Sequence, residues 1–209
     1  MNDRTLTEDR RDCLQEVVNV AMGQAGDSLA RYLEVFVYLS VPEIKLVDSA
    51  ELATMLDEAG EEGKKISAVR QAFYNSEDAN GMRGEAIMSF NDAAFASFAD
   101  LLDYETLGQD SESEILLDIT NILNSTCLNG IAEQMEFDLA YSPPSIIGRK
   151  IEPSAVVRHE NMDWDQALLV RIHYTIEDHK VDCSMMLLMP GEAVESVLHS
   201  LDQLLDDMD

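Results

Sequence analysis

Two long segments of the chain carry apolar residues at the three- to four-residue spacing of an amphipathic helix. They span Thr7 to Arg31 and Ser111 to Glu136. A Ser/Thr-x-x-Glu sequence stands near the start of each segment, at Thr5–Glu8 and at Ser111–Glu114. This is the spacing of a capping box, in which the hydroxyl and the carboxylate satisfy free backbone donors. We therefore predict two long helices with capped N-termini.

Shorter apolar runs follow each predicted helix, and turn-forming residues separate them. After a proline, the runs Ile44–Val47 and Ser145–Ile151 have the length of single strands. Longer runs then form two pairs joined by turn-rich segments, which is the pattern of β-hairpins. These pairs are Ile66–Tyr74 with Gly84–Phe90, and Ala167–Ile176 with Val181–Met189.

The same order of elements occurs twice, and each half closes with a predicted helix, at about Asp92–Asp103 and Gly191–Asp207. A shift of 102 residues superimposes the first long helix on the second and brings AVRQAFY onto VRIHYTI. We interpret residues 1–209 as a single domain of two internal repeats, about 5–104 and 110–207. The predicted fold is α+β, with one antiparallel sheet packed with the two long helices and further helices, and with a pseudo-twofold axis between the repeats.

The charge balance is strongly acidic and narrows the choice of partners. Lys and Arg number 14 against 41 Asp and Glu, which gives a formal net charge of −27 at pH 7. Such a surface would repel nucleic acid, and the sequence has no basic stripe with interleaved aromatic residues. We therefore expect no nucleic-acid partner. The acidity either attracts a basic protein surface or serves solubility alone.

The cysteines and the hydropathy favour a reduced, cytoplasmic setting. Cys13, Cys127 and Cys183 are odd in number and widely spaced, so we expect buried thiols and no disulfide framework. No stretch of about 18 apolar residues occurs, and no basic segment precedes an N-terminal apolar run. We expect neither membrane insertion nor a signal peptide.

Polar and small residues form a stripe along the first predicted helix. Asp12, Glu16, Asn19, Gly23 and Gly26 follow one another at i, i+4, i+7, i+11 and i+14. A solvated face usually carries long charged side chains, whereas each glycine here costs helix stability of about 1 kcal/mol relative to alanine. This stripe therefore indicates a face that another molecule approaches closely. The opposite, apolar face holds Leu14, Val17, Val18, Ala21, Ala25 and Leu29.

The second predicted helix repeats this division of faces. Glu114, Asp118, Asn121 and Ser125 lie on the polar side. The apolar side holds Leu116, Ile119, Leu123 and Cys127. The candidate site is therefore present twice.

The first half resembles the CheC, CheX and FliY phosphatases, whose signature is Asp/Ser-x3-Glu-x2-Asn-x22-Pro. Asp12, Glu16, Asn19 and Pro42 stand at every fixed position of that signature. The resemblance covers essentially the whole chain, because the length and the two-site arrangement are more similar to CheC than to the smaller, single-site CheX. FliY would carry additional switch-related sequence that is not present here.

The second half keeps the spacing of the signature and departs from it in two side chains. Asn121 and Pro144 are in place, but Asp118 replaces the glutamate and Glu114 replaces the aspartate or serine. The shorter Asp118 loses roughly 1.5 Å of reach. Other roles are open: Glu114 could serve the capping box, the carboxylates could be ordinary exposed helix residues, and both prolines could be purely structural.

The resemblance implies a phosphatase that hydrolyses the aspartyl phosphate of a phosphorylated CheY-type response regulator. In that family the asparagine, here Asn19 and its counterpart Asn121, positions the attacking water. The glutamate, here Glu16 with Asp118 as its counterpart, approaches the active-site lysine of the regulator. Magnesium would come from the regulator, so no cofactor or metal site is expected on this chain. The histidines are scattered in agreement with this, at His159, His173, His179 and His199.

A non-catalytic role is the alternative that the altered second motif favours. On that hypothesis the chain is a binding module or scaffold. Its partners would be response regulators, a CheD-type deamidase or the flagellar switch. The intact first motif favours the phosphatase.

Overall fold

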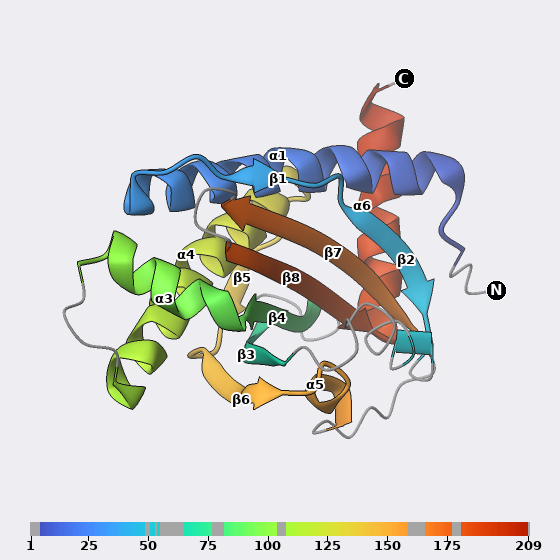
Figure 1. Cartoon of the computed structure of the whole chain (residues 1–209). Coiled ribbons are helices and arrows are strands. Elements are labelled where there is room, and N and C mark those ends of the chain that lie inside the picture. Colours follow the sequence, from blue (N-terminus) through green and yellow to red (C-terminus); the bar gives the residue numbers. More distant parts are fainter. Residues whose placement is uncertain are drawn as a thin grey trace.

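The computed structural model describes residues 5–48, 51–52, 54, 65–76, 82–103, 108–158, 166–176 and 181–208 (Figure 1). The two predicted long helices are present as α1, Glu8–Leu33, and α4, Gln109–Gln134. The shorter helices are α3 (Asp92–Leu101), α5 (Ala155–Arg158) and α6 (Glu192–Met208). Both predicted closing helices, α3 and α6, are therefore confirmed.

Eight strands within the described ranges form one antiparallel sheet. They are β1 (Tyr38–Leu39), β2 (Glu43–Val47), β3 (Ile66–Asn75), β4 (Arg83–Asn91), β5 (Leu139–Tyr141), β6 (Ser145–Ile151), β7 (Ala167–Ile176) and β8 (Val181–Pro190). Their order is β1-β7-β8-β4-β3-β5, and β2 also pairs with β7 while β6 also pairs with β3. The predicted α+β class and both hairpins are confirmed.

Each half of the chain supplies strands to both sides of the sheet. β1 and β2 from the first half pair with β7 from the second, and β5 and β6 pair with β3 from the first. Reversing the strand order and exchanging the halves gives the same order again. A pseudo-twofold relation would produce this symmetry, and the origin of the two halves as repeats of one unit stays a prediction.

The strand register corrects the alignment of the two halves at the hairpins. Glu43 lies opposite Arg171, and Ser145, the counterpart of Glu43, lies opposite Arg70. Arg70 therefore corresponds to Arg171, whereas the shift of 102 residues aligns it with Ile172. Neighbouring strand residues point to opposite faces of a sheet, so this one-residue error would exchange the two faces of the hairpin.

The main core lies between the sheet and the helices α1 and α4, and β8 divides its side chains between the two faces of the sheet. Alternate residues of β8 enter the main core: Val181, Cys183, Met185, Leu187 and Met189. Met186 and Leu188 join a smaller cluster on the other face, with Val156 of α5. The two-residue period of a strand explains this division. The predicted apolar faces of both long helices are buried, as expected.

The helix N-termini differ from the prediction. Thr7 caps α1, and its side chain accepts a hydrogen bond from the backbone N–H of Arg10. Gly108 precedes α4 without a side-chain cap, and Ser111 and Glu114 lie inside that helix. Both predicted capping boxes are therefore wrong, and so is the capping role considered for Glu114. The short elements β1, β5 and α5 were not predicted, because two to four residues are too few to show a period.

Helices α1 and α4 run antiparallel and approach closely where a glycine faces an alanine. A Cβ atom on Gly130 would lie 3.0 Å from both Cα and Cβ of Ala21, and 2.7 Å from Oε1 of Gln24. Beside this crossing, the Gln134 amide donates hydrogen bonds to the carbonyls of Val17 (3.0 Å) and Gly130 (2.9 Å). The absence of a side chain at position 130 therefore sets the distance between the two motif-bearing helices.

We expect Gly130→Val to lower the free energy of unfolding by about 2 kcal/mol, because its side chain would overlap Ala21. Gly23→Ala in α1 is the matched control, since a Cβ there meets nothing within 4 Å. That variant should gain up to about 1 kcal/mol from helix propensity. Urea unfolding measures both. A Gly130→Val protein as stable as the wild type would contradict the close packing.

Candidate functional site

The first motif forms an exposed row on α1. Asp12, Glu16 and Asn19 are all exposed, while the opposite side of the helix is buried in the core. The amide of Asn19 forms no hydrogen bond to another described residue, so its donor and acceptor both face solvent. Pro42 is buried between β1 and β2 and begins the turn into β2. The three helical residues thus expose their polar groups to solvent, whereas the proline is a structural residue between two strands.

Serines that the motif does not include fix the segments before both motif prolines. The backbone N–H of Ser40 donates to the carbonyl of His173 (3.2 Å), and the N–H of His173 donates to Oγ of Ser40 (3.3 Å). Ser142 makes the same reciprocal pair with Ala72, at 2.9 and 3.0 Å. Sequence reasoning missed these residues, although Ser-x-Pro at equivalent places in both halves was the available signal.

The second motif forms a separate row on α4. Glu114, Asp118 and Asn121 are exposed, and Pro144 is half-buried. Tyr32, near the end of α1, flanks this row: burial, and after it the negative charges of Asp118 and Glu114, raise the pKa of Tyr32. The phenol therefore stays neutral and can donate a hydrogen bond. The antiparallel helices thus hold two distinct sites with different neighbours.

The glycines of the polar stripe have different roles from those predicted. Gly26 is buried, and a Cβ there would lie 3.2 Å from both Cδ atoms of Leu39. Leu39 of the same chain covers Gly26, so the prediction that Gly26 lies on a face approached by another molecule is wrong. Gly23 is half-buried and has open space in front of it, so it still fits the prediction of a surface that another molecule approaches.

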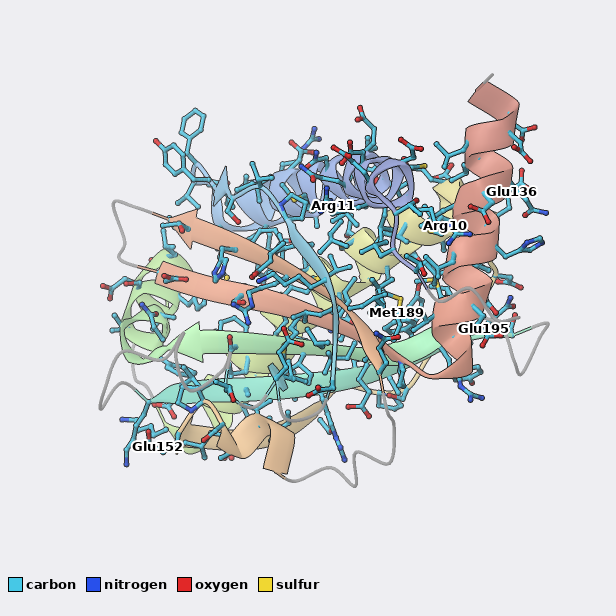
Figure 2. The ribbon with its side chains drawn as sticks, turned by 90° about the vertical axis from the view of Figure 1, so that its right-hand side faces the viewer. Arg10, Arg11, Glu136, Glu152, Met189 and Glu195 are labelled. Atoms are coloured by element: carbon cyan, nitrogen blue, oxygen red, sulfur yellow. The ribbon has the colours of Figure 1, made fainter. Side chains whose placement is uncertain are left out.

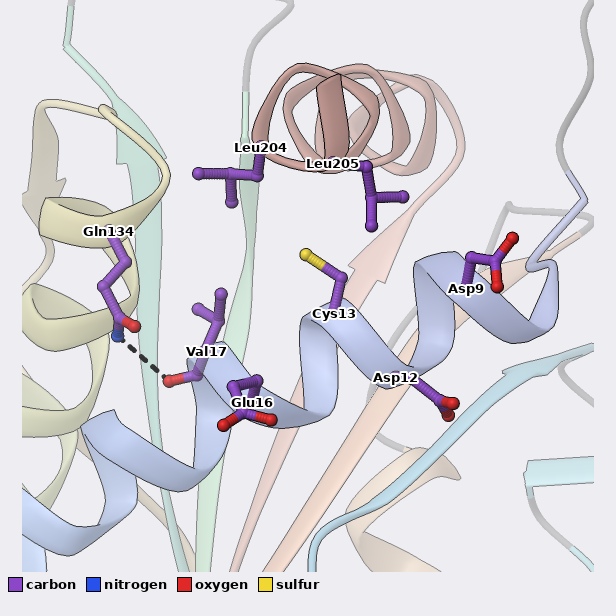
Figure 3. A pocket seen from close by; sticks show the side chains of 8 residues that line it. All are labelled: Asp9, Asp12, Cys13, Glu16, Val17, Gln134, Leu204 and Leu205. Atoms are coloured by element: carbon purple, nitrogen blue, oxygen red, sulfur yellow. Dashed lines mark hydrogen bonds between the residues drawn. The ribbon is translucent and has the colours of Figure 1, made fainter. Parts of the chain in front are cut away.

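A cleft of about 870 Å³ opens beside the first motif, between α1, the end of α4 and the end of α6 (Figure 3). Figure 3 shows Leu204 and Leu205 of α6 pointing toward α1, and Cys13 pointing toward α6. The remaining lining residues are Asp9, Asp12, Glu16, Val17 and Gln134. The sequence pattern predicted α6 as an amphipathic helix but gave no sign that its end forms a wall next to the motif.

The thiols provide no nucleophile for this cleft. Burial, and after it the charge of Glu16, raise the pKa of Cys13, so the neutral thiol is favoured. Cys127 and Cys183 are buried, as predicted, whereas Cys13 is only partly buried. Burial raises the pKa of Cys127 to about 12. The chemistry of the site therefore rests on carboxylates and amides.

An ion pair holds α6 against α1 at the edge of the cleft. Arg10 donates from Nε and Nη2 to the two carboxylate oxygens of Asp202, at 2.7 Å each. Figure 2 shows Arg10 on α1 beside the ribbon of α6. The hydrogen bonds from Arg10 lower the pKa of Asp202. This two-point contact fixes the angle at which the end of α6 passes α1.

Among the described residues, no group of three or more His, Cys, Asp or Glu could hold a metal ion. None of the described helices combines the length and the apolar character that crossing a membrane requires.

Comparisons with known proteins agree on the fold. A scan of the sequence against family models and a search of curated proteins each found no match. Among solved structures, FliY from Thermotoga maritima is similar over 95% of this chain and 98% of that chain, with a TM-score of 0.67 and 16% identity.

Two further structures show the range of this fold. FliM in a FliG–FliM complex from H. pylori matches 92% of this chain and 99% of that chain, with a TM-score of 0.60 and 12% identity. A CheC-like chemotactic protein from Shewanella oneidensis matches 81% and 95%, with a TM-score of 0.53 and 10% identity. The chain therefore has a CheC/FliY-type fold, which the sequence resemblance predicted.

We expect Asp202→Asn to weaken the attachment of α6 in a pH-dependent way. The pKa of Asp202 is lowered in the folded protein, so the pair stabilises above the unfolded-chain pKa of about 3.9 and loses this effect as the pH falls through the folded pKa. Asp202 is 44% exposed, so the loss at neutral pH should be only about 0.5 kcal/mol. Urea unfolding from neutral pH to about pH 3 measures it. A difference that grows at low pH would contradict this assignment.

Proposed function

We propose that the chain is a phosphatase that hydrolyses the aspartyl phosphate of a CheY-type response regulator. The observation that carries the proposal is the complete motif of Asp12, Glu16, Asn19 and Pro42 on a CheC/FliY-type fold, with its three helical side chains exposed on one face of α1. On this proposal the protein modulates chemotaxis signalling by shortening the lifetime of the phosphorylated regulator.

The proposed reaction needs little from the enzyme beyond placement. An aspartyl phosphate is a mixed anhydride, so a water that attacks phosphorus in line releases inorganic phosphate and leaves a free carboxylate on the regulator. The amide of Asn19 can hold that water with both its donor and its acceptor. No covalent intermediate on this chain is required, and Mg²⁺ would be held by the regulator.

Glu16 is proposed to fix the register between the two proteins. It stands one helical turn before Asn19 on the same exposed face. A carboxylate there can pair with the active-site lysine of the regulator, and this contact would place the phosphoryl group in front of the asparagine. Asp12 extends the row by one further turn.

The second site is proposed to be weaker for a physical reason. Asp118 is about 1.5 Å shorter in reach than glutamate, and Tyr32 stands beside it. Asn121 could still hold a water, but the docking contact that brings the phosphoryl group to it would be lengthened. The two sites therefore differ in docking more than in the water-positioning group.

We expect Asn19→Ala to reduce the acceleration of dephosphorylation by about 100-fold, because the attacking water loses its positioning group. The assay measures release of phosphate from a phosphorylated CheY-type regulator with Mg²⁺ present. Asn121→Ala is the matched control, since the same exposed side chain is removed from α4, and it should have a smaller effect. Equal losses from both variants would contradict a dominant first site.

We expect Asp118→Glu to strengthen the second site, because it restores the missing methylene. The cleanest background is Asn19→Ala, in which the remaining activity comes from the second site. There the added substitution should raise the rate by about tenfold, equivalent to roughly 1.4 kcal/mol of restored docking. Adding Asn121→Ala should abolish that gain. No gain in the Asn19→Ala background would show that reach does not limit this site.

A second candidate function is a non-catalytic binding module or scaffold. The observations that favour it are the altered second motif and the similarity in fold to FliM, which was solved in complex with FliG. Its partners would be response regulators, a CheD-type deamidase or the flagellar switch. The phosphate-release assay distinguishes the two functions. A scaffold would bind the regulator without exceeding the regulator's own rate of dephosphorylation.

A further inference from the structure

The two halves of the fold differ in the length of their closing helices. α6 contains 17 residues, whereas its counterpart α3 contains 10. The extra turns carry α6 past α1, so that its C-terminal end projects beyond the helix that bears the first motif (Figure 1). Of these two closing helices, α6 lines the cleft described above, and none of the lining residues comes from the described part of α3. The symmetry of the fold is therefore broken beside the intact motif.

The cleft has one apolar side and one acidic side. Leu204 and Leu205 of α6 are only half-buried, and they leave apolar surface open between the helices, above the buried Val17. On α1, Asp9, Asp12 and Glu16 also line the cleft, and Figure 3 shows the Asp12 carboxylate pointing away from α6. An apolar side chain could insert between the helices while cations on the same segment face the row of carboxylates.

The end of α6 carries charge of the sign that the helix itself disfavours. A helix C-terminus has partial negative charge and is stabilised by Lys, Arg or His. The last turn of α6 has no basic residue, and Asp206 and Asp207 are exposed there. Arg10, the nearest cation on α1, already pairs with Asp202. A cationic partner would therefore stabilise this helix end.

We propose that the cleft between α1 and α6 is a docking groove for a basic amphipathic segment of the protein partner. An apolar anchor of that segment would pack against Leu204 and Leu205, and its Lys or Arg residues would face Asp9 and the end of α6. Identifying this partner as the response regulator rests on the proposed function. The groove would then favour docking at the first site.

Leu205→Asp tests the groove with two readouts. In the phosphatase assay it should raise KM for the phosphorylated regulator by about tenfold and leave kcat unchanged, because it removes docking without touching the water-positioning amide. A fluorescein-labelled 18-residue helical peptide of Lys and Leu should bind the wild type, and this variant about tenfold more weakly. Leu205→Ser, which adds no charge, is measured in parallel, and thermal unfolding checks that both variants are folded.

Leu102→Asp is the matched control, since it places the same charge on a half-buried leucine at the end of α3. It should leave both KM and peptide affinity at wild-type values. If the peptide binds Leu205→Asp and Leu205→Ser as tightly as it binds the wild type, the groove is overturned. If the wild type shows no phosphatase activity while the peptide result holds, the groove stands and the proposed function fails.

Discussion

The close packing of α1 against α4 determines where the helical residues of both motifs lie. Gly130 has no side chain, so the backbone of α4 comes near enough to Ala21 that a Cβ would be crowded at 3.0 Å. Gln134 secures the crossing through hydrogen bonds to both helices. Because the inner faces of the two helices pack in this contact and against the sheet, the polar rows lie on their exposed sides. The candidate chemistry is thus a consequence of packing on the opposite side of each helix.

The sheet adds a second constraint, because strands from each half pair with the other half. Ser40 and Ser142 anchor the segments before the motif prolines by equivalent reciprocal hydrogen bonds. Each long helix therefore leads into a strand that is held by the opposite half of the chain. The two halves therefore share one sheet, and they differ at the surface. They do so at Asp118, at Tyr32 and at the length of α6, which is where selectivity between the sites is expected.

Periodicity predicted the long helices, both hairpins and the closing helices, since each is long enough to bury a regular face. It failed where the decisive contact joins distant parts of the chain. Gly26 packs against Leu39 rather than facing a partner, because local spacing does not reveal which surface is covered. The cap of α1 was missed for a local reason, since the Ser/Thr-x-x-Glu spacing pointed to Thr5 while Thr7 makes the capping hydrogen bond. The motif residues were found because four fixed positions make a pattern. The cleft was not predicted, because Leu204 and Leu205 are 187 or more residues from Val17 in the sequence. Their pattern is that of an ordinary amphipathic helix end.

The most direct test of the central claim is to follow the oxygen of the attacking water. Dephosphorylation of a phosphorylated CheY-type regulator in ¹⁸O-water, with and without this protein, shows which bond is broken and whether the protein accelerates it. Attack on phosphorus, with water held by Asn19, predicts faster turnover and ¹⁸O in the released phosphate. A rate equal to the regulator's own, or ¹⁸O in the aspartate carboxylate, would contradict the account.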